Sequence, residues 1–180
     1  ETLAEAQAQL KDLPQPWLAV MPGAARGPAK RWPPAHFAAL ARRWVDEQRG
    51  GVVLLGGRDD AAVCAEMATA LGPAALNLAG QTSLPLWVSL LKTCGAVVAN
   101  DSGGMHLAAA VGTPGAAVFG LTDPARTGPL GRTIRVLQDP GGRRRDIARD
   151  SAEAQKRLAA ISPERVYETL LEARRESTAT

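Results

Sequence analysis

The sequence predicts an α/β protein built on a doubly wound, mostly parallel sheet of about six strands. Short apolar runs rich in small and β-branched residues alternate with longer segments whose apolar residues recur at helical spacing. Several of these runs are continuously apolar, which indicates strands buried on both faces, as in a parallel sheet. Gly- and Pro-rich stretches separate runs and helices, and we expect right-handed crossovers between neighbouring strands.

The first part of the chain predicts a helix, a strand and a second helix. Leucines at helical spacing predict a short amphipathic helix over 1–13, which Pro14 and Pro16 end. The apolar run 17–21 is the first strand. Residues 35–48 form the next helix, and Gly50 and Gly51 stop it. Its expected buried stripe is Phe37, Leu40, Ala41, Trp44 and Val45.

The middle of the chain repeats this alternation. The run 51–57, GVVLLGG, is a second strand that ends in a glycine pair, and the helix 61–71 follows it. A short third strand is expected over 75–78. The helix over 84–93 then follows, with Trp87, Leu90 and Leu91 pointing inward.

The last part supplies three more strands and two helices. Strands are expected over 96–99, 115–119 and 133–137. An Ala-rich helix runs from Met105 to about Val111, and Ser162 with Pro163 starts a final helix that reaches about Arg174. These elements complete the expected sheet.

The composition limits the kinds of partner. A content of 46% hydrophobic and 22% charged residues is typical of a soluble globular domain, and 180 residues can bury a real core. The net charge of +3 permits an anionic ligand without requiring nucleic acid. Cys64 and Cys94 lie in neither a CxxC motif nor a His/Cys cluster, so we expect no disulfide framework and no metal site. A reducing, cytoplasmic setting fits best.

Targeting and membrane signals are not evident in the sequence. No apolar run approaches the roughly 18 residues of a membrane span, and no signal peptide is recognisable. The chain opens in a helical segment without an initiator Met, so we expect a piece of a longer protein.

The segment 96–110, AVVANDSGGMHLAAA, is the strongest candidate for a binding site. It joins a buried strand, a glycine turn and a helix, and the first N–H groups of a helix have no partner inside it. Such a unit is an anion site. Ser102 is the expected N-cap, which leaves the amides of Gly103, Gly104 and Met105 to face a ligand.

Two side chains of this segment have structural explanations as well. His106 leans back toward the same anion, yet a backbone carbonyl commonly satisfies a helix histidine. Asp101 stands at the lip of the turn, where it is either a ligand group or a capping residue. Most strand–turn–helix units with glycines bind nothing, so this segment alone leaves both explanations open.

Other polar residues follow neighbouring strands, at the edge of an open parallel sheet where ligands bind. The loop 22–34 carries Lys30 and Arg31, although adjacent basic residues are more often a solvated surface. Trp32 is expected to anchor this loop and to hold Lys30 in place. Asp60 either complements a helix dipole or accepts a ribose hydroxyl.

The basic run from Arg143 to Arg145 is treated first as a solvated loop, with contact to an anionic glycolipid or membrane surface as the alternative.

Three motifs together resemble a known family. GPAKRWP at 27–33, NDSGGMHLAAA at 100–110 and FGLTDPARTGP at 119–129 resemble the carboxyl-terminal half of bacterial glycosyltransferase family 9, the lipopolysaccharide heptosyltransferases. The first of these motifs is more similar to the heptosyltransferase II type. The resemblance spans about 17–171 and implies a Rossmann-like domain that forms the C-terminal half of a GT-B enzyme.

The resemblance also implies a reaction. Heptose would be transferred with inversion from ADP-L-glycero-D-manno-heptose to the lipopolysaccharide inner core, without a cofactor or a required metal. Residues 1–16 would be a helix and linker, and 17–175 would be the donor-binding domain. The lipid A–Kdo acceptor and the general base would belong to an amino-terminal half absent from this sequence. This chain alone would then be inactive or nearly so, cytoplasmic, and at most peripheral on the inner membrane.

The same resemblance assigns roles to individual residues. Lys30 matches the lysine that contacts the donor phosphate and stabilises the leaving group. Gly23 and Ala24 match backbone positions near that phosphate. Asp60 matches the carboxylate that reaches the ribose, and Thr82 falls in the segment that borders the adenine.

Within the glycine turn, Asp101 would hold heptose hydroxyls. Ser102, Gly103 and His106 would contact the diphosphate. Gly104 departs from the family, whose members often carry Pro or a larger apolar residue there. We expect this glycine to loosen the turn without removing the site.

Other functions stay open or are disfavoured. A family 9 domain with a different nucleotide sugar or acceptor, and a non-catalytic nucleotide-binding domain, both fit the sequence. NAD-dependent redox chemistry is disfavoured because no GxGxxG motif follows the first strand. Serine hydrolysis is disfavoured because Ser102 is not in a GxSxG elbow.

Overall fold

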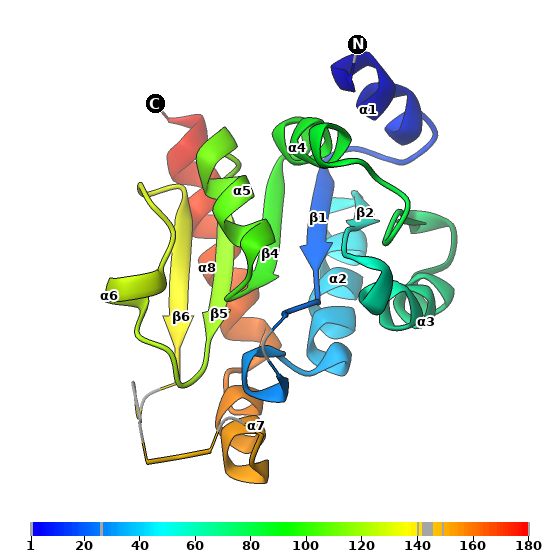
Figure 1. The fold of residues 1–180 in the computed structure, drawn as a ribbon. Coiled ribbons are helices and arrows are strands. Elements are labelled where there is room, and N and C mark those ends of the chain that lie inside the picture. Colours follow the sequence, from blue (N-terminus) through cyan, green and yellow to red (C-terminus); the bar gives the residue numbers. More distant parts are fainter. Residues whose placement is uncertain (1, 26, 140, 142–145, 149, 180) are drawn as a thin grey trace.

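In the computed structural model the chain forms a six-stranded parallel sheet with helices on both faces (Figure 1). The structure describes residues 2–25, 27–139, 141, 146–148 and 150–179. The strands are β1 Trp17–Met21, β2 Gly51–Leu54, β3 Ala75–Asn77, β4 Ala96–Asn100, β5 Gly115–Phe119 and β6 Ile134–Gln138. The α-helices are α1 Thr2–Leu10, α2 Pro34–Gln48, α3 Ala61–Leu71, α4 Leu84–Thr93, α5 Gly103–Val111, α6 Pro124–Thr127, α7 Ala152–Ala159 and α8 Pro163–Thr178. Short 3-10 turns lie at η1 Pro28–Lys30, η2 Arg58–Asp60 and η3 Gly72–Ala74.

The strand order β3-β2-β1-β4-β5-β6 confirms the predicted doubly wound, Rossmann-like sheet. The chain builds outward from β1 in one direction, then crosses back and builds outward from β4 in the other. β1 and β4 are neighbours in parallel register, with Met21 beside Ala99. The loops that leave these two strands therefore start side by side, at the point where such sheets bind ligands.

Alternate strand residues face two separate cores. In β1, Leu18 and Val20 join the core beneath α2, α3 and α8, whereas Ala19 and Met21 join the core beneath α1, α4 and α5. Both faces are apolar, as the continuous apolar runs predict. In the expected stripe of α2 only Val45 is not fully buried.

Several boundaries differ from the expectations for physical reasons. The strand expected over 51–57 ends at Leu54, because the chain then turns so that the Gly57 amide donates to the Asp60 carboxylate at 2.9 Å. The first helix ends at Leu10 instead of residue 13. α7, which was not predicted from the sequence, is a short amphipathic helix whose N-cap, Ser151, accepts from the Ala154 amide at 3.2 Å.

The two cysteines, Cys64 and Cys94, are buried and free. Burial raises the pKa of both thiols to about 12. Both are therefore protonated near neutral pH and poor nucleophiles. No helix in the described ranges is long and apolar enough to cross a membrane.

The close contact between β4 and β5 makes Gly115 a test of this packing. A Cβ at residue 115 would lie 2.2 Å from the Val97 carbonyl oxygen. We predict that Gly115→Ala lowers the free energy of unfolding in urea by about 2–3 kcal/mol. Gly103→Ala is the control, because a Cβ there meets nothing within 4 Å. Equal midpoints for Gly115→Ala and wild type would contradict the strand packing.

Candidate functional site

Asn100, at the end of β4, joins the loop after β1 to the sheet. Its side chain is fully buried, and Oδ1 accepts from the backbone N–H of Trp32 at 2.9 Å. Its Nδ2 donates to the Pro22 carbonyl at 2.7 Å. The buried indole of Trp32 donates to the Ile161 carbonyl at 2.9 Å. Trp32 thus anchors the loop, as the sequence predicts, and keeps Lys30 at the carboxyl edge of the sheet.

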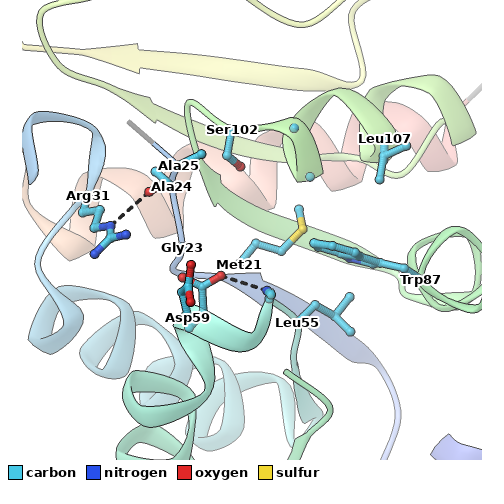
Figure 2. A pocket seen from close by; sticks show the side chains of 15 residues that line it. Met21, Gly23, Ala24, Ala25, Arg31, Leu55, Asp59, Trp87, Ser102 and Leu107 are labelled. Carbon is cyan, nitrogen blue, oxygen red and sulfur yellow. Dashed lines mark hydrogen bonds between the residues drawn. The ribbon is translucent and has the colours of Figure 1, made fainter. Parts of the chain in front are cut away.

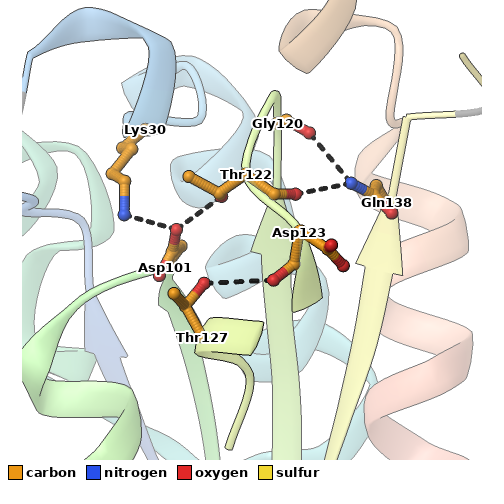
Figure 3. A network of polar contacts seen from close by, with 7 residues as sticks. All are labelled: Lys30, Asp101, Gly120, Thr122, Asp123, Thr127 and Gln138. Carbon is orange, nitrogen blue, oxygen red and sulfur yellow. Dashed lines mark hydrogen bonds and ion pairs between the residues drawn. The ribbon is translucent and has the colours of Figure 1, made fainter. Parts of the chain in front are cut away.

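Asp101, the next residue, is the centre of a polar network (Figure 3). It is only 5% exposed, and its Oδ2 accepts from Lys30 Nζ at 2.5 Å and from the Thr122 hydroxyl at 2.6 Å. Among the described residues, no group donates to Oδ1, and the carboxylate caps no helix amide. Asp101 is therefore not a capping residue, which removes one of the two explanations for it.

The N-terminus of α5 lies next to Asp101. Ser102 is the N-cap residue, as predicted, but its hydroxyl caps no amide of the helix. The helix begins at Gly103, two residues earlier than expected. The first amides of a helix have no partner inside it, and the N-cap hydroxyl of Ser102 accepts from none of them. This end of α5 is therefore an electropositive terminus open to an anion.

Gly104 is buried, and the space beside it is filled. A Cβ at this position would lie 2.5 Å from the Met21 sulfur and 3.4 Å from the Trp87 ring. These two side chains occupy the volume that a larger residue at 104 would need, so the turn is packed there.

A pocket of about 530 Å³ opens at the carboxyl ends of β1, β2 and β4 (Figure 2). Its apolar wall consists of Met21, Leu55, Trp87 and Leu107. Its other lining residues are Gly23, Ala24, Ala25, Arg31, Gly56, Gly57, Asp59, Asp60, Ser102, Gly103 and Gly104. The pocket thus combines an apolar wall, two carboxylates and the α5 terminus.

A second hollow, of about 310 Å³, lies on the other side of that terminus. Its lining is more polar and comprises Ala25, Lys30, Asp101, Ser102, Gly103, His106 and Thr127. The two hollows share Ala25, Ser102 and Gly103, so they meet at the start of α5. His106 is exposed there, and within the described chain no backbone carbonyl accepts from it.

Asp60 is held tightly between glycines. A Cβ at Gly23 would lie 2.2 Å from its carboxylate, and one at Gly56 would lie 2.7 Å from its Cβ. One oxygen, Oδ2, accepts from the Gly57 amide, so the carboxylate closes the turn before α3. Asp60 therefore has a structural role and also lines the larger pocket.

The structure brings together most of the residues predicted for the site. Gly23, Ala24, Asp60 and Gly104 line the larger pocket, and Lys30, Asp101 and His106 line the smaller one, with Ser102 and Gly103 between them. Thr82, in the loop after β3, lines neither hollow. The run Arg143–Arg145 lies outside the described residues.

Sequence reasoning missed several lining groups. Trp87 packs against the core that contains Leu90 and Leu91, as expected, and it also lines the pocket, which was not expected. Helical spacing does not reveal this second role, because a core face and a pocket wall look alike in sequence. Thr122 and Thr127 lie in the third motif, and their position after β5 is the signal that marks them. In the described part of the chain, no cluster of three His, Cys, Asp or Glu side chains could hold a metal ion.

Comparison with known proteins decides the family. The model of glycosyltransferase family 9 (heptosyltransferase) matches residues 1–156. The chain belongs to glycosyltransferase family 9. This confirms the resemblance predicted from the three motifs.

Family 9 relatives of this chain are longer than it is. The chain is 40% identical over 161 residues to lipopolysaccharide heptosyltransferase 2 of Escherichia coli, covering 87% of this chain and 46% of that protein. It is 38% identical to lipooligosaccharide heptosyltransferase 2 of Haemophilus influenzae, and the match covers 96% of this chain and 51% of that protein. The structure of E. coli ADP-heptose LPS heptosyltransferase II matches with a TM-score of 0.82 and 34% identity, and this match covers 98% of this chain and 52% of that structure's chain. The chain thus spans about half the length of these family members.

The buried amide of Asn100 gives a test of how the site is assembled. We predict that Asn100→Leu lowers the free energy of unfolding by about 2–5 kcal/mol, because the Trp32 N–H and the Pro22 carbonyl lose their partner. Urea unfolding measures this loss. Asn77→Leu is the matched control, since half-buried Asn77 accepts one hydrogen bond, from Ala79, and its loss should cost at most about 1 kcal/mol. Equal losses in the two variants would contradict the role of Asn100.

Proposed function

We propose that this chain is the donor-binding part of an inverting heptosyltransferase. The whole protein would transfer heptose from ADP-L-glycero-D-manno-heptose to the lipopolysaccharide inner core. Family membership and the similarity to proteins named heptosyltransferase 2 support this proposal. The observation that carries it is the pair of joined hollows at the α5 terminus, one suited to a nucleoside and one to charged and hydroxylated groups.

The larger pocket suits the ADP nucleoside. Its volume of about 530 Å³ lies in the range of small-molecule sites. Its apolar wall offers the side chains of Trp87, Met21 and Leu107 to a flat base (Figure 2). Asp60 is the proposed ribose ligand through Oδ1, because Oδ2 is bonded to the Gly57 amide. Gly23 and Ala24 would border the phosphates, and Thr82 would need a loop movement to reach the adenine.

The α5 terminus between the hollows suits the diphosphate. Ser102, Gly103 and His106 line the smaller hollow at this terminus, and the Ser102 hydroxyl caps no amide of the helix. Negative charge grows on the diphosphate as the sugar leaves, and fixed positive groups stabilise that charge where it develops. Lys30 supplies a full positive charge at the same place.

The smaller hollow suits the sugar. Asp101 keeps Oδ1 without a donor among the described residues, and a carboxylate oxygen accepts readily from sugar hydroxyls. Lys30 is bonded to the other oxygen, so it bridges the proposed sugar ligand and the proposed phosphate ligands. With Lys30 and the helix amides at the diphosphate, we propose that transfer requires no metal.

The remaining parts of the reaction are proposed to come from the other half of the protein. Asp101 is paired with Lys30, so we assign the general base and the lipid A–Kdo acceptor site to an acceptor domain. Residues 1–16 would be a helix and linker that packs on α4, and 17–175 the donor domain. The proposed place of action is the cytoplasm or the inner face of the inner membrane, where the lipid-linked acceptor lies.

Calorimetric titration of ADP tests the donor site. We predict that ADP binds, that UDP binds more weakly, and that Lys30→Ala lowers ADP affinity about 10- to 100-fold, the loss expected for one charge-assisted hydrogen bond. Lys92→Ala, an exposed lysine in the last turn of α4, is the matched control and should bind like wild type. Equal ADP affinity in the Lys30 and Lys92 variants would contradict the assignment.

The rate of heptose transfer tests whether the general base lies in the acceptor domain rather than in this chain. We predict that this chain by itself binds ADP-heptose but transfers heptose at least about 100-fold more slowly than the full-length protein, because a general base contributes roughly 10²–10⁴-fold. ADP release in the presence of acceptor glycolipid measures the rate, with a blank lacking acceptor to correct for hydrolysis. Transfer by this chain at the full-length rate would show that it carries its own base.

A further inference from the structure

Thr122 contacts the proposed sugar ligand from a loop that the sequence analysis did not assign to the site. It follows β5, and its hydroxyl donates to Asp101 Oδ2 at 2.6 Å (Figure 3). Lys30 donates to the same oxygen. Two donors therefore converge on one carboxylate oxygen and leave Oδ1 for another partner.

The Thr122 loop is itself held firmly. The side-chain amide of Gln138, at the end of β6, donates to the Thr122 carbonyl at 2.7 Å and to the Gly120 carbonyl at 3.2 Å. Gly120 lies so close to the turn before Lys30 that a Cβ on it would be 2.6 Å from the Ala29 carbonyl oxygen. Leu121 is buried and packs in one cluster with Ala29. The loop thus presents the Thr122 hydroxyl from a fixed position.

A carboxylate needs such support if only one of its oxygens is to face a ligand. The terminal torsion of an aspartate is broad and roughly two-fold, so a single cation leaves the group able to rotate. The Lys30 ammonium group alone could donate to either oxygen or to both. A second donor on Oδ2, coming from a different loop, fixes the plane of the carboxylate and the direction of Oδ1.

We propose that Thr122, supported by Gln138, is a positioning residue that orients Asp101 toward the donor sugar. This inference rests on the proposed function, because it deepens the assignment of Asp101 to the sugar hydroxyls. The inference implies that Thr122 affects the binding of the sugar part of ADP-heptose and not the binding of ADP. The proposed nucleoside contacts come from other residues, and the proposed diphosphate ligand Lys30 keeps its own bond to Asp101 Oδ2 without the Thr122 hydroxyl.

The test compares ADP with ADP-heptose binding to this chain by calorimetry. We expect Thr122→Val to weaken ADP-heptose binding about 10-fold, as for the loss of one oriented hydrogen bond to a charged group, while ADP affinity changes less than about 2-fold. Thr122→Ser keeps the hydroxyl and should restore the wild-type ratio of the two affinities. In an Asp101→Asn background, Thr122→Val should change the ratio no further.

Gln138→Leu is the second variant, and it keeps the test decisive if Thr122→Val does not fold. It removes only the support of the loop carbonyls and should shift the ratio in the same direction by a smaller factor. Equal losses of ADP and ADP-heptose affinity, or an unchanged ratio of the two affinities in both Thr122→Val and Gln138→Leu, would overturn the positioning role. The proposed function would still stand in that case, provided that the wild-type chain binds both ligands. A wild-type chain that binds neither ligand would overturn the proposed function and this inference together.

Discussion

The hydrogen bonds of the buried Asn100 side chain are the constraint on which the site depends. A buried amide must find partners, and here both partners are backbone groups of the loop after β1. This requirement places Trp32 in the core and Lys30 beside Asp101. The ion pair, the polar hollow and the approach to the α5 terminus all follow from the position of that loop. Two adjacent residues therefore have different roles: Asn100 fixes the loop after β1, and Asp101 is the proposed sugar ligand.

The fold was largely predictable because its signals are local. β1, β5, α3 and α4 have the boundaries expected from apolar runs, proline positions and glycine stops. α7 was not predicted, although its sequence carries local helix signals: it is amphipathic, it begins at the Ser151 cap, and its buried residues Ala154 and Leu158 lie four positions apart. Eight residues make only about two turns of helix, so this signal is short.

The candidate site was predictable in its residue types but not in its bonding. Motif order and the carboxyl-edge rule found Lys30, Asp101 and the α5 turn. They could not show that one oxygen of Asp60 accepts from the Gly57 amide, or that the Ser102 hydroxyl caps no amide of α5. They also could not show that Trp87, which packs against the core, lines the pocket as well. These properties depend on side-chain directions that are set by packing across the sheet.

The proposed donor site gives the ion pair between Lys30 and Asp101 a consequence for product release. Under that proposal, Asp101 neutralises the partly buried ammonium group of Lys30 whenever no diphosphate is bound. The carboxylate would compete with the diphosphate for the same ammonium group and so would favour dissociation of the spent nucleotide. An enzyme built in this way would moderate its own product inhibition through a contact that also prepares it for the next donor molecule.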